Sequence, residues 1–368
     1  MRESPTPQRG LKAIRPYVSG KPIDEVKREM GLDDVIKLAS NENPLGVSPR
    51  ALAAIRNAAS TVNVYPDAAS YDLRTAIGEH FELLRDQVAV GSGADDLILQ
   101  LAMAYLDDGD EVIVSRSSFP IYDVYANVMR AVLRKTPLDA AMRLDLDAMA
   151  DAIGPKTKMV VVCNPNNPTG TIVTADAVNR MIRRVPEHVL LVIDEAYVEM
   201  VDSDAFPDSL AYVREGRRNV VVLRTFSKVY GLAGIRLGYA FAAPEIVSTL
   251  MQVKMVFNVS VVAQAAGIAA LQDRAFLKQS VAANRAGRQQ LCRAFDRMGL
   301  TYAESHTNFV LVRIGPDALT IQKQLLSDGV IVRPCSAYEL PEHLRISIGT
   351  PVQNERFIAA LSARLAAR

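Results

Sequence analysis

The sequence is poor in cysteine and histidine, and neither residue type forms a pattern. The three cysteines, Cys163, Cys292 and Cys335, lie far apart and include no Cys-x-x-Cys pair. This argues against both a disulfide framework and a zinc site. The four histidines are scattered without the spacing of metal ligands. We therefore expect reduced thiols and no bound metal.

An excess of charge and a long apolar run are also missing. The formal net charge is +1, so no broad positive field is present to attract nucleic acid or an anionic membrane. No stretch approaches the roughly 18 apolar residues that span a bilayer, and residues 1–20 lack the apolar segment of a secretory signal. We expect a cytoplasmic protein without nucleic-acid or membrane partners, in which local groups hold any anionic ligand.

What the sequence does contain is the composition of a folded protein with a large core. Apolar residues make up 49% and charged residues 23% of 368 residues, which is enough for more than one domain. From about residue 86, short apolar runs alternate with helical patterns, which predicts an α/β fold with a mainly parallel seven-stranded sheet. The predicted strands are Gln87–Gly91, Glu111–Ser115, Ala131–Lys135, Met159–Cys163, Val189–Asp194, Val220–Thr225 and Gly238–Ala242.

After residue 262 the pattern changes to that of a smaller α+β domain. A long helical stretch over 263–298 is predicted to break near Asp273. The later predicted elements are strands at 301–303, 309–314, 330–333 and 344–348, a helix near 318–327 and a terminal helix. We expect an N-terminal arm (1–40) that packs on the C-terminal domain or a partner, a large domain (41–262) and a small domain (263–368).

Two loops follow predicted strands, at the edge where open α/β sheets bind ligands. Gly91-Ser92-Gly93-Ala94-Asp95 opens a helix, and a glycine-rich helix N-terminus suits a phosphate. An ordinary glycine-rich turn is the alternative. In the segment 164–170, two prolines restrict the backbone, so Asn167 can be aimed at the oxygen of a bound ring. A plain turn is the alternative for that segment.

A carboxylate and an amine follow the next two strand patterns. Asp194 ends an apolar run, where a carboxylate is costly to bury unless it faces a cation such as a protonated pyridine nitrogen. Tyr197, three residues later, is in reach of the same ring, and a helix cap is the alternative role for Asp194. The amine of Lys228 suits a Schiff base once it is desolvated. Ser227 and Arg236 flank it and suit a phosphate.

These four features, in this order, resemble the aspartate-aminotransferase superfamily of fold type I enzymes, which use pyridoxal 5′-phosphate. The resemblance covers nearly the whole chain. It implies that Lys228 carries the cofactor and serves as general base and acid, and that Asp194 keeps the pyridine nitrogen protonated. Together with Tyr197, these are the implied catalytic residues. The implied cofactor contacts are Gly93, Ala94, Asp95, Phe119, Asn167, Asp194, Tyr197, Ser227, Lys228 and Arg236, with Tyr65 supplied to the neighbouring subunit.

The segments 36–46 and 65–67 resemble, more closely, the histidinol-phosphate aminotransferase branch. This implies a homodimer in histidine biosynthesis that converts histidinol phosphate and 2-oxoglutarate to imidazole acetol phosphate and glutamate. The implied substrate contacts are Tyr17, Asn43, Asn167 and Arg345, of which Arg345 would bind the substrate anion.

Two segments depart from the common pattern of that branch, Lys254–Ser260 and Pro334–Tyr338. Both are expected near the substrate, so the amino donor stays open. An aromatic amino-acid aminotransferase is the main alternative, and a threonine-phosphate decarboxylase shares the scaffold. A non-catalytic regulator that binds the same cofactor is a further alternative, but the sequence has neither a helix-turn-helix extension nor a basic patch.

Overall fold

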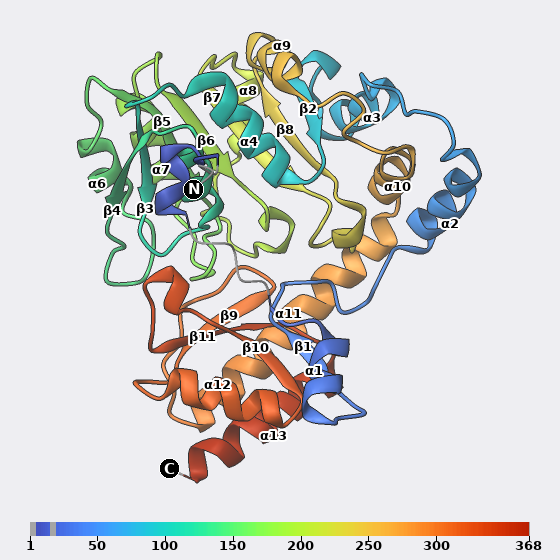
Figure 1. Ribbon diagram of the computed structural model, residues 1–368, viewed down its shortest axis with the longest axis vertical. Helices are drawn as coiled ribbons and strands as arrows, with labels where there is room; N and C mark the ends of the chain where they lie inside the picture. The colour runs from blue at the N-terminus through green and yellow to red at the C-terminus, as the bar shows by residue number, and fades with distance from the viewer. Residues whose placement is uncertain (1–4, 15–19, 368) are drawn as a thin grey trace.

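The computed structural model describes residues 5–14 and 20–367, which fold around two sheets (Figure 1). The larger sheet has the strand order β2-β8-β7-β6-β5-β3-β4. Strand β8 pairs antiparallel with both of its neighbours, and all the other pairs are parallel. The expected mainly parallel seven-stranded sheet is therefore confirmed. Its strands are β2 (Val88–Gly91), β3 (Glu111–Ser115), β4 (Val132–Thr136), β5 (Thr157–Cys163), β6 (Leu190–Asp194), β7 (Val220–Thr225) and β8 (Gly238–Ala242).

Helices cover both faces of the larger sheet, which explains why its central strands read as continuous apolar runs. In β5, Val160 and Val162 pack into the core of one face, whereas Met159 and Val161 pack into the other. Helices α4, α5 and α9 cover the second of these faces, and α3, α6, α7, α8 and α10 cover the first. These helices and their neighbour α2 are α2 (Pro49–Ala58), α3 (Tyr71–Phe81), α4 (Ala94–Tyr105), α5 (Ile121–Val128), α6 (Leu146–Asp151), α7 (Ala175–Arg184), α8 (Ser209–Arg214), α9 (Pro244–Val253) and α10 (Val261–Gln272).

The smaller sheet has the order β1-β10-β11-β9 and its own apolar core. Strand β1 comes from the N-terminal arm and pairs parallel with β10, so the two ends of the chain build one sheet. The predicted strand at 301–303 is wrong, because only Tyr302 forms an isolated bridge, to Val312. The elements are α1 (Ile23–Met30), β1 (Ile36–Leu38), α11 (Arg274–Arg297), β9 (Phe309–Arg313), α12 (Ala318–Ser327), β10 (Val330–Pro334), β11 (His343–Ser347) and α13 (Pro351–Ala366).

The predicted helix break at Asp273 lies between α10 and α11. The Asp273 side chain accepts the Phe276 N–H at 3.1 Å as the N-cap of α11, and the Ser48 hydroxyl donates to it at 2.6 Å. Helix α10 packs in the core of the larger sheet, and a Cβ on its Gly267 would lie 2.5 Å from Leu237. We therefore propose that the larger part of the molecule extends to Asp273 and that the boundary lies there, not at residue 262.

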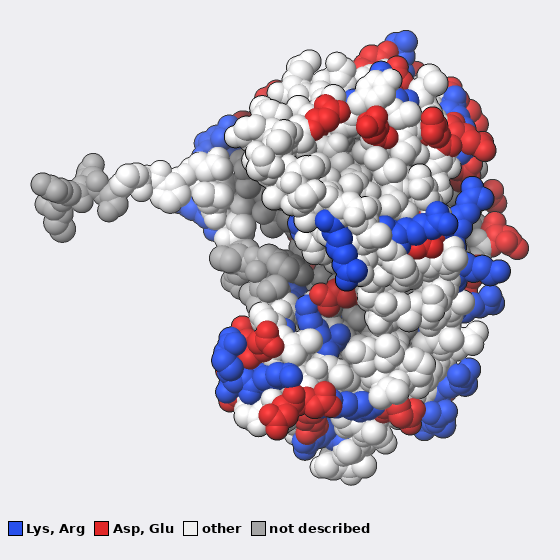
Figure 2. All heavy atoms as spheres, turned by 90° about the vertical axis from the view of Figure 1, so that its right-hand side faces the viewer, with Lys and Arg blue, Asp and Glu red and all other residues white. Residues whose placement is uncertain are grey.

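One side of the molecule, beside α2 and α10, exposes apolar side chains from two segments. Residues Val62, Val64 and Tyr65 are more than 60% exposed, as are Met255 and Val256. The Tyr65 ring stacks on Phe257 with 4.5 Å between centroids, which brings the two segments together. Figure 2 shows this side, where uncharged areas lie between scattered charged side chains. None of the helices in the described part of the chain has the length and apolar character needed to cross a bilayer.

Candidate active site

The candidate site forms where the parallel strands β5, β6 and β7 end side by side. Their register places Cys163 beside Asp194, and Asp194 beside Leu223. The loop with Asn167 leaves β5, Asp194 is the last residue of β6, and Lys228 follows β7 by three residues. The carboxyl ends of parallel strands share one edge of the sheet, so residues far apart in the sequence meet at this place.

Asp194 is a buried carboxylate held by two hydrogen bonds. The Tyr122 hydroxyl donates to its Oδ2 at 2.9 Å, and the Ala196 N–H donates to its Oδ1 at 3.2 Å. Burial raises the pKa of Asp194 to about 6, an effect that these two hydrogen bonds oppose and the charges of Asp95 and Glu195 strengthen. A cation in front of this carboxylate would restore the charged form.

Lys228 is half-buried and lies next to Tyr197. Its Nζ is 5.7 Å from the centroid of the Tyr197 ring, and the hydroxyl of that ring accepts the Asn41 amide at 3.0 Å. Burial raises the pKa of Asp95, and the positive charges of Arg236 and Lys228 oppose this effect. The amine, the tyrosine and Asp95 therefore belong to one electrostatic environment.

The glycine-rich turn between β2 and α4 lies against Arg236. Gly93 has a φ of +89°, and a Cβ added to it would lie 2.4 Å from the Arg236 guanidinium. A Cβ on Gly238 would lie 2.3 Å from the Ala94 nitrogen, so β8 also approaches the start of α4 closely. Glycine is needed at both positions for this approach. The helix N-terminus, the guanidinium and the nearby Ser227 together suit a phosphate.

Asn167 connects this edge of the larger sheet to Arg345 of β11. Arg345 is 3% exposed, and its Nη1 donates to the Asn167 Oδ1 at 2.6 Å. Its Nη2 donates to the Ala39 carbonyl at 2.8 Å. The Tyr338 hydroxyl lies 3.4 Å from the same guanidinium. The expected substrate-binding arginine is thus at the site, fixed by groups from three segments.

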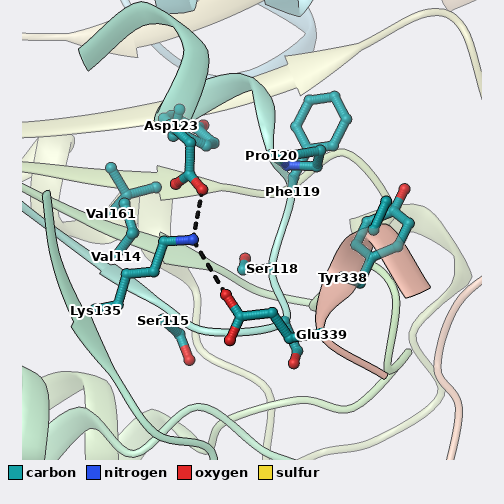
Figure 3. Close-up of a pocket in the computed structure, with 13 residues that line it drawn as sticks. Val114, Ser115, Ser118, Phe119, Pro120, Asp123, Lys135, Val161, Tyr338 and Glu339 are labelled. Atoms are coloured by element: carbon teal, nitrogen blue, oxygen red, sulfur yellow. Dashed lines mark hydrogen bonds and ion pairs between the residues drawn. The ribbon is translucent and has the colours of Figure 1, made fainter. Parts of the chain in front are cut away.

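Phe119 lines a polar pocket beside the site (Figure 3). Tyr338, in the short helix that follows β10, also lines this pocket. Between the two elements, the Lys135 ammonium forms ion pairs with Asp123 at 2.7 Å and with Glu339 at 3.4 Å. Since Asp123 is in α5 and Glu339 follows the short helix, Lys135 ties the larger sheet to the smaller one.

Two of the expected residues, Tyr65 and Asn43, make their contacts outside this cluster of side chains. Tyr65 is 78% exposed on the apolar side of the molecule. Tyr17 lies outside the described residues. The Asn43 amide nitrogen donates to the Val229 carbonyl and the Ser280 hydroxyl, and its oxygen accepts the Leu45 N–H, so its expected substrate role stays a prediction. Through these hydrogen bonds, the Asn43 amide holds the loop that carries Lys228 in place.

The structure brings in three residues that the sequence reasoning missed. Asn41, two residues before Asn43, is the asparagine that contacts Tyr197. Tyr122, which contacts Asp194, lies one helical turn after Phe119, and that spacing was an available signal. Arg333 pairs directly opposite Arg345 across β10 and β11. An arginine in an otherwise apolar strand was the signal for it.

These side chains fit pyridoxal phosphate. A buried carboxylate suits a protonated ring nitrogen, a half-buried amine suits an aldehyde, and the turn packed against Arg236 offers a helix N-terminus and positive charge for a phosphate. The sheet order and this site together define a fold type I pyridoxal-phosphate enzyme.

Comparison with known proteins identifies the family within this class of enzymes. The sequence model for aminotransferase class I and II matches residues 33–361. The chain belongs to this aminotransferase family. It is 46% identical to histidinol-phosphate aminotransferase of Moorella thermoacetica, over 98% of this chain and 94% of that protein. It is 42% identical to histidinol-phosphate aminotransferase 2 of Carboxydothermus hydrogenoformans, over 96% of this chain and 98% of that one.

Solved structures agree with this placement. Histidinol-phosphate aminotransferase from Sinorhizobium meliloti, in complex with pyridoxal 5′-phosphate, superposes with a TM-score of 0.92 at 30% identity, covering 100% of this chain and 99% of that one. Aspartate aminotransferase from Thermus thermophilus with maleate gives a TM-score of 0.85 at 25% identity, over 99% and 100% of the two chains. The expected fold, enzyme class and cofactor are confirmed.

Proposed function

We propose that this enzyme transfers the amino group of histidinol phosphate to 2-oxoglutarate. An aminotransferase of this family exchanges an amino group between an amino donor and a 2-oxo acid. The named relatives at 42% and 46% identity support histidinol phosphate as the donor. One pocket must then accept an anionic phosphate from the donor and a carboxylate from glutamate.

A pair of buried arginines carries this proposal. Arg345 and Arg333 are directly opposed in the antiparallel pair β10–β11, so their side chains leave the same face of the small sheet. They are 3% and 8% exposed. A doubly charged anion can bind two neighbouring guanidinium groups at once. A phosphate supplies two negative charges, whereas the α-carboxylate of an aromatic amino acid supplies one.

In the proposed mechanism, each residue either acts on the reacting carbon or holds the cofactor. Pyridoxal phosphate, when bound, supplies a reactive aldehyde and a ring that withdraws electrons. The Lys228 amine removes and returns the proton at the reacting carbon. Asp194 holds a proton on the ring nitrogen. Tyr197 and Asn167 orient the ring oxygen, and Arg236 with the backbone of Gly93 and Ala94 holds the phosphate. The Ser227 hydroxyl and the backbone N–H of Asp95 would complete the phosphate site, and Phe119 would provide an aromatic contact for the ring.

The donor specificity gives the test of this function. The wild-type enzyme is expected to have a kcat/KM for histidinol phosphate at least about 100-fold above that for phenylalanine or tyrosine, because a charge-assisted contact is worth about 3 kcal/mol. Arg345→Gln should lower kcat/KM for histidinol phosphate more than for the aromatic amino acids and so reduce this preference, because the phosphate carries the larger charge. Stopped-flow measurement of the half-reaction with each donor checks this.

Arg313→Gln is the matched control for that experiment. Arg313 lies on the neighbouring strand β9 and pairs with Glu342 at the surface, 57% exposed. It should keep the wild-type preference. Equal kcat/KM values for histidinol phosphate and the aromatic amino acids in the wild-type enzyme would refute the proposed donor.

We also propose that the enzyme is a homodimer in which Tyr65 completes the partner's phosphate site. The support is its position, because Tyr65 is 78% exposed, stacked on Phe257 and surrounded by the exposed Val62, Val64 and Met255. An exposed apolar patch of this kind is typical of a protein interface. A second copy of the chain is the occupant that would give the tyrosine a phosphate to bind.

Removing the Tyr65 hydroxyl is expected to weaken cofactor binding without changing the fold. A hydrogen bond to a charged group contributes about 1.5–3 kcal/mol, so Tyr65→Phe should raise the Kd for pyridoxal phosphate about 10- to 100-fold. Fluorescence titration of the apoenzyme measures this, and light scattering measures the dimer mass. Tyr71→Phe, at another exposed tyrosine that lies under Arg85, is the control. A monomeric wild-type protein, or an unchanged Kd in Tyr65→Phe, would contradict the proposal.

A further inference from the structure

Tyr122 contacts two parts of the candidate site, Asp194 and Phe119. It is the second residue of α5 and is only 4% exposed. Its hydroxyl donates to the Asp194 Oδ2 at 2.9 Å. Its ring packs edge-on against Phe119, with 6.5 Å between centroids and an angle of 82°. One side chain thus contacts both the carboxylate and the ring expected on the two sides of the cofactor.

The hydrogen bond from Tyr122 to Asp194 comes from a side chain, so a substitution can remove it. Within the described residues, two donors hold the carboxylate, the Ala196 N–H on Oδ1 and the Tyr122 hydroxyl on Oδ2. The backbone donor is built into the turn after β6. The tyrosine comes from a different element, 72 positions earlier in the chain, so its contact to Asp194 depends on the packing of α5 against the sheet.

The surroundings of Tyr122 keep its hydroxyl protonated, so that it can donate this hydrogen bond. Burial and the charge of Asp194 raise the pKa of Tyr122 well above its ordinary value, so the hydroxyl keeps its proton at every working pH. The other titratable groups that face the pair are Asp95 from α4, Cys163 from β5 and Glu195 from the loop after β6. Burial raises the pKa of Cys163 as well, so the thiol stays neutral. Asp95 and Glu195 both disfavour charge on Asp194.

We propose that Tyr122 is a positioning residue of the reaction, which keeps the Asp194 carboxylate ionised and aimed at the cofactor ring and supports the Phe119 ring on the other side. The proposal rests on pyridoxal phosphate binding beside Asp194, as the proposed function requires. Tyr122 itself touches neither the cofactor nor the substrate. It acts through Asp194 by its hydroxyl and through Phe119 by its ring, and these two actions can be separated by mutation.

Tyr122→Phe removes the hydroxyl and keeps the ring. We expect cofactor affinity to fall about tenfold, the strength of one hydrogen bond to a charged group. kcat should fall by a similar factor, while KM for the amino donor stays within twofold, because the substrate contacts are untouched. The titration of Asp194 in the apoenzyme, followed by NMR with labelled aspartate, should move to higher pH. A residue with a merely structural role would not move that titration.

Tyr122→Leu removes both the hydroxyl and the ring. It should add a change in the visible circular dichroism of the bound cofactor, because the Phe119 ring loses its support. Tyr125→Phe is the matched control, one turn further along α5, and should behave as the wild-type enzyme. The thermal midpoint of each apoenzyme identifies a variant that fails to fold, and Tyr122→Phe then decides, because it keeps the packed ring.

The outcomes separate this inference from the proposed function. A wild-type protein that binds no pyridoxal phosphate would refute the proposed function. Normal binding by the wild-type protein, together with an unchanged Asp194 titration and an unchanged cofactor affinity in Tyr122→Phe, would overturn the role of Tyr122 alone. A tenfold loss of affinity with a shifted titration in Tyr122→Phe, absent in Tyr125→Phe, would establish it.

Discussion

Lys228→Ala is expected to lower the rate of transamination at least about 1,000-fold. General acid–base catalysis by a positioned side chain contributes about 10²- to 10⁴-fold, and the covalent attachment of the cofactor is lost in addition. Lys228 is half-buried, and its Nζ lies 5.7 Å from the centroid of the Tyr197 ring. Steady-state turnover with histidinol phosphate and 2-oxoglutarate gives the measurement.

A chemical readout separates loss of the amine from loss of the fold. Borohydride should fix the cofactor on the wild-type peptide that contains Lys228, and mass spectrometry should find no such adduct in Lys228→Ala. Lys323→Ala, in α12 of the small sheet layer, should retain full turnover and the adduct. Near-normal turnover in Lys228→Ala, or an adduct on another lysine of the wild-type protein, would remove Lys228 from its proposed role.

The elements that position Lys228 were predictable because they depend on short-range signals. Strands β3, β7 and β8 have the bounds that their apolar runs predict. Each of these strands is covered on both faces, so apolar character alone marks its length. The order of motifs along the chain then placed the glycine turn, Asn167, Asp194 and Lys228 at one edge, because parallel strands align their ends.

What could not be predicted depends on contacts between distant segments. Asn41 and Asn43 lie in the same short motif, and only the tertiary packing shows that the first contacts Tyr197 and the second holds the Lys228 loop. Likewise, the pairing of Arg333 with Arg345 requires the register of β10 against β11. Under the proposed boundary at Asp273, helix α10 belongs to the larger part of the molecule, and its sequence alone does not reveal which core it fills. Side-chain direction and register are properties of the fold, and local patterns do not encode them.

Asp194→Asn is expected to lower kcat about 10²- to 10⁴-fold. Removing one partner of a buried ion pair costs about 3–5 kcal/mol, and each 1.36 kcal/mol on the barrier is a factor of ten. The asparagine keeps the size of the side chain and an oxygen to accept the Tyr122 hydroxyl, so the loss reports on charge. Single-turnover kinetics with saturating donor check the prediction. Asp202→Asn, in the ion-pair cluster with Arg288 and His306, is the control and should retain kcat within a few-fold.

The same substitution should stabilise the apoenzyme above pH 6. The pKa of Asp194 is about 6 in the fold and 3.8 as the ordinary value, so between these pH values the folded state binds more protons than the unfolded state. Stability contributed by this group therefore falls as the pH rises from about 4 to 6, by about 3 kcal/mol in total. Asparagine does not titrate, so the variant escapes this loss, less about 1 kcal/mol for an impaired hydrogen bond.

Urea unfolding of the two apoenzymes at pH 4.5 and pH 7.5 measures this difference. We expect Asp194→Asn to unfold at a higher urea concentration than the wild-type protein at pH 7.5, with most of the advantage lost at pH 4.5. Saturating pyridoxal phosphate should reverse the order at pH 7.5, because a protonated ring nitrogen stabilises only the wild-type carboxylate. An apoenzyme that is more stable with Asp194 at pH 7.5 would mean that the carboxylate is not strained by burial. A loss of kcat together with a gain of apoenzyme stability in Asp194→Asn would show that the Asp194 charge destabilises the apoenzyme and serves the bound cofactor.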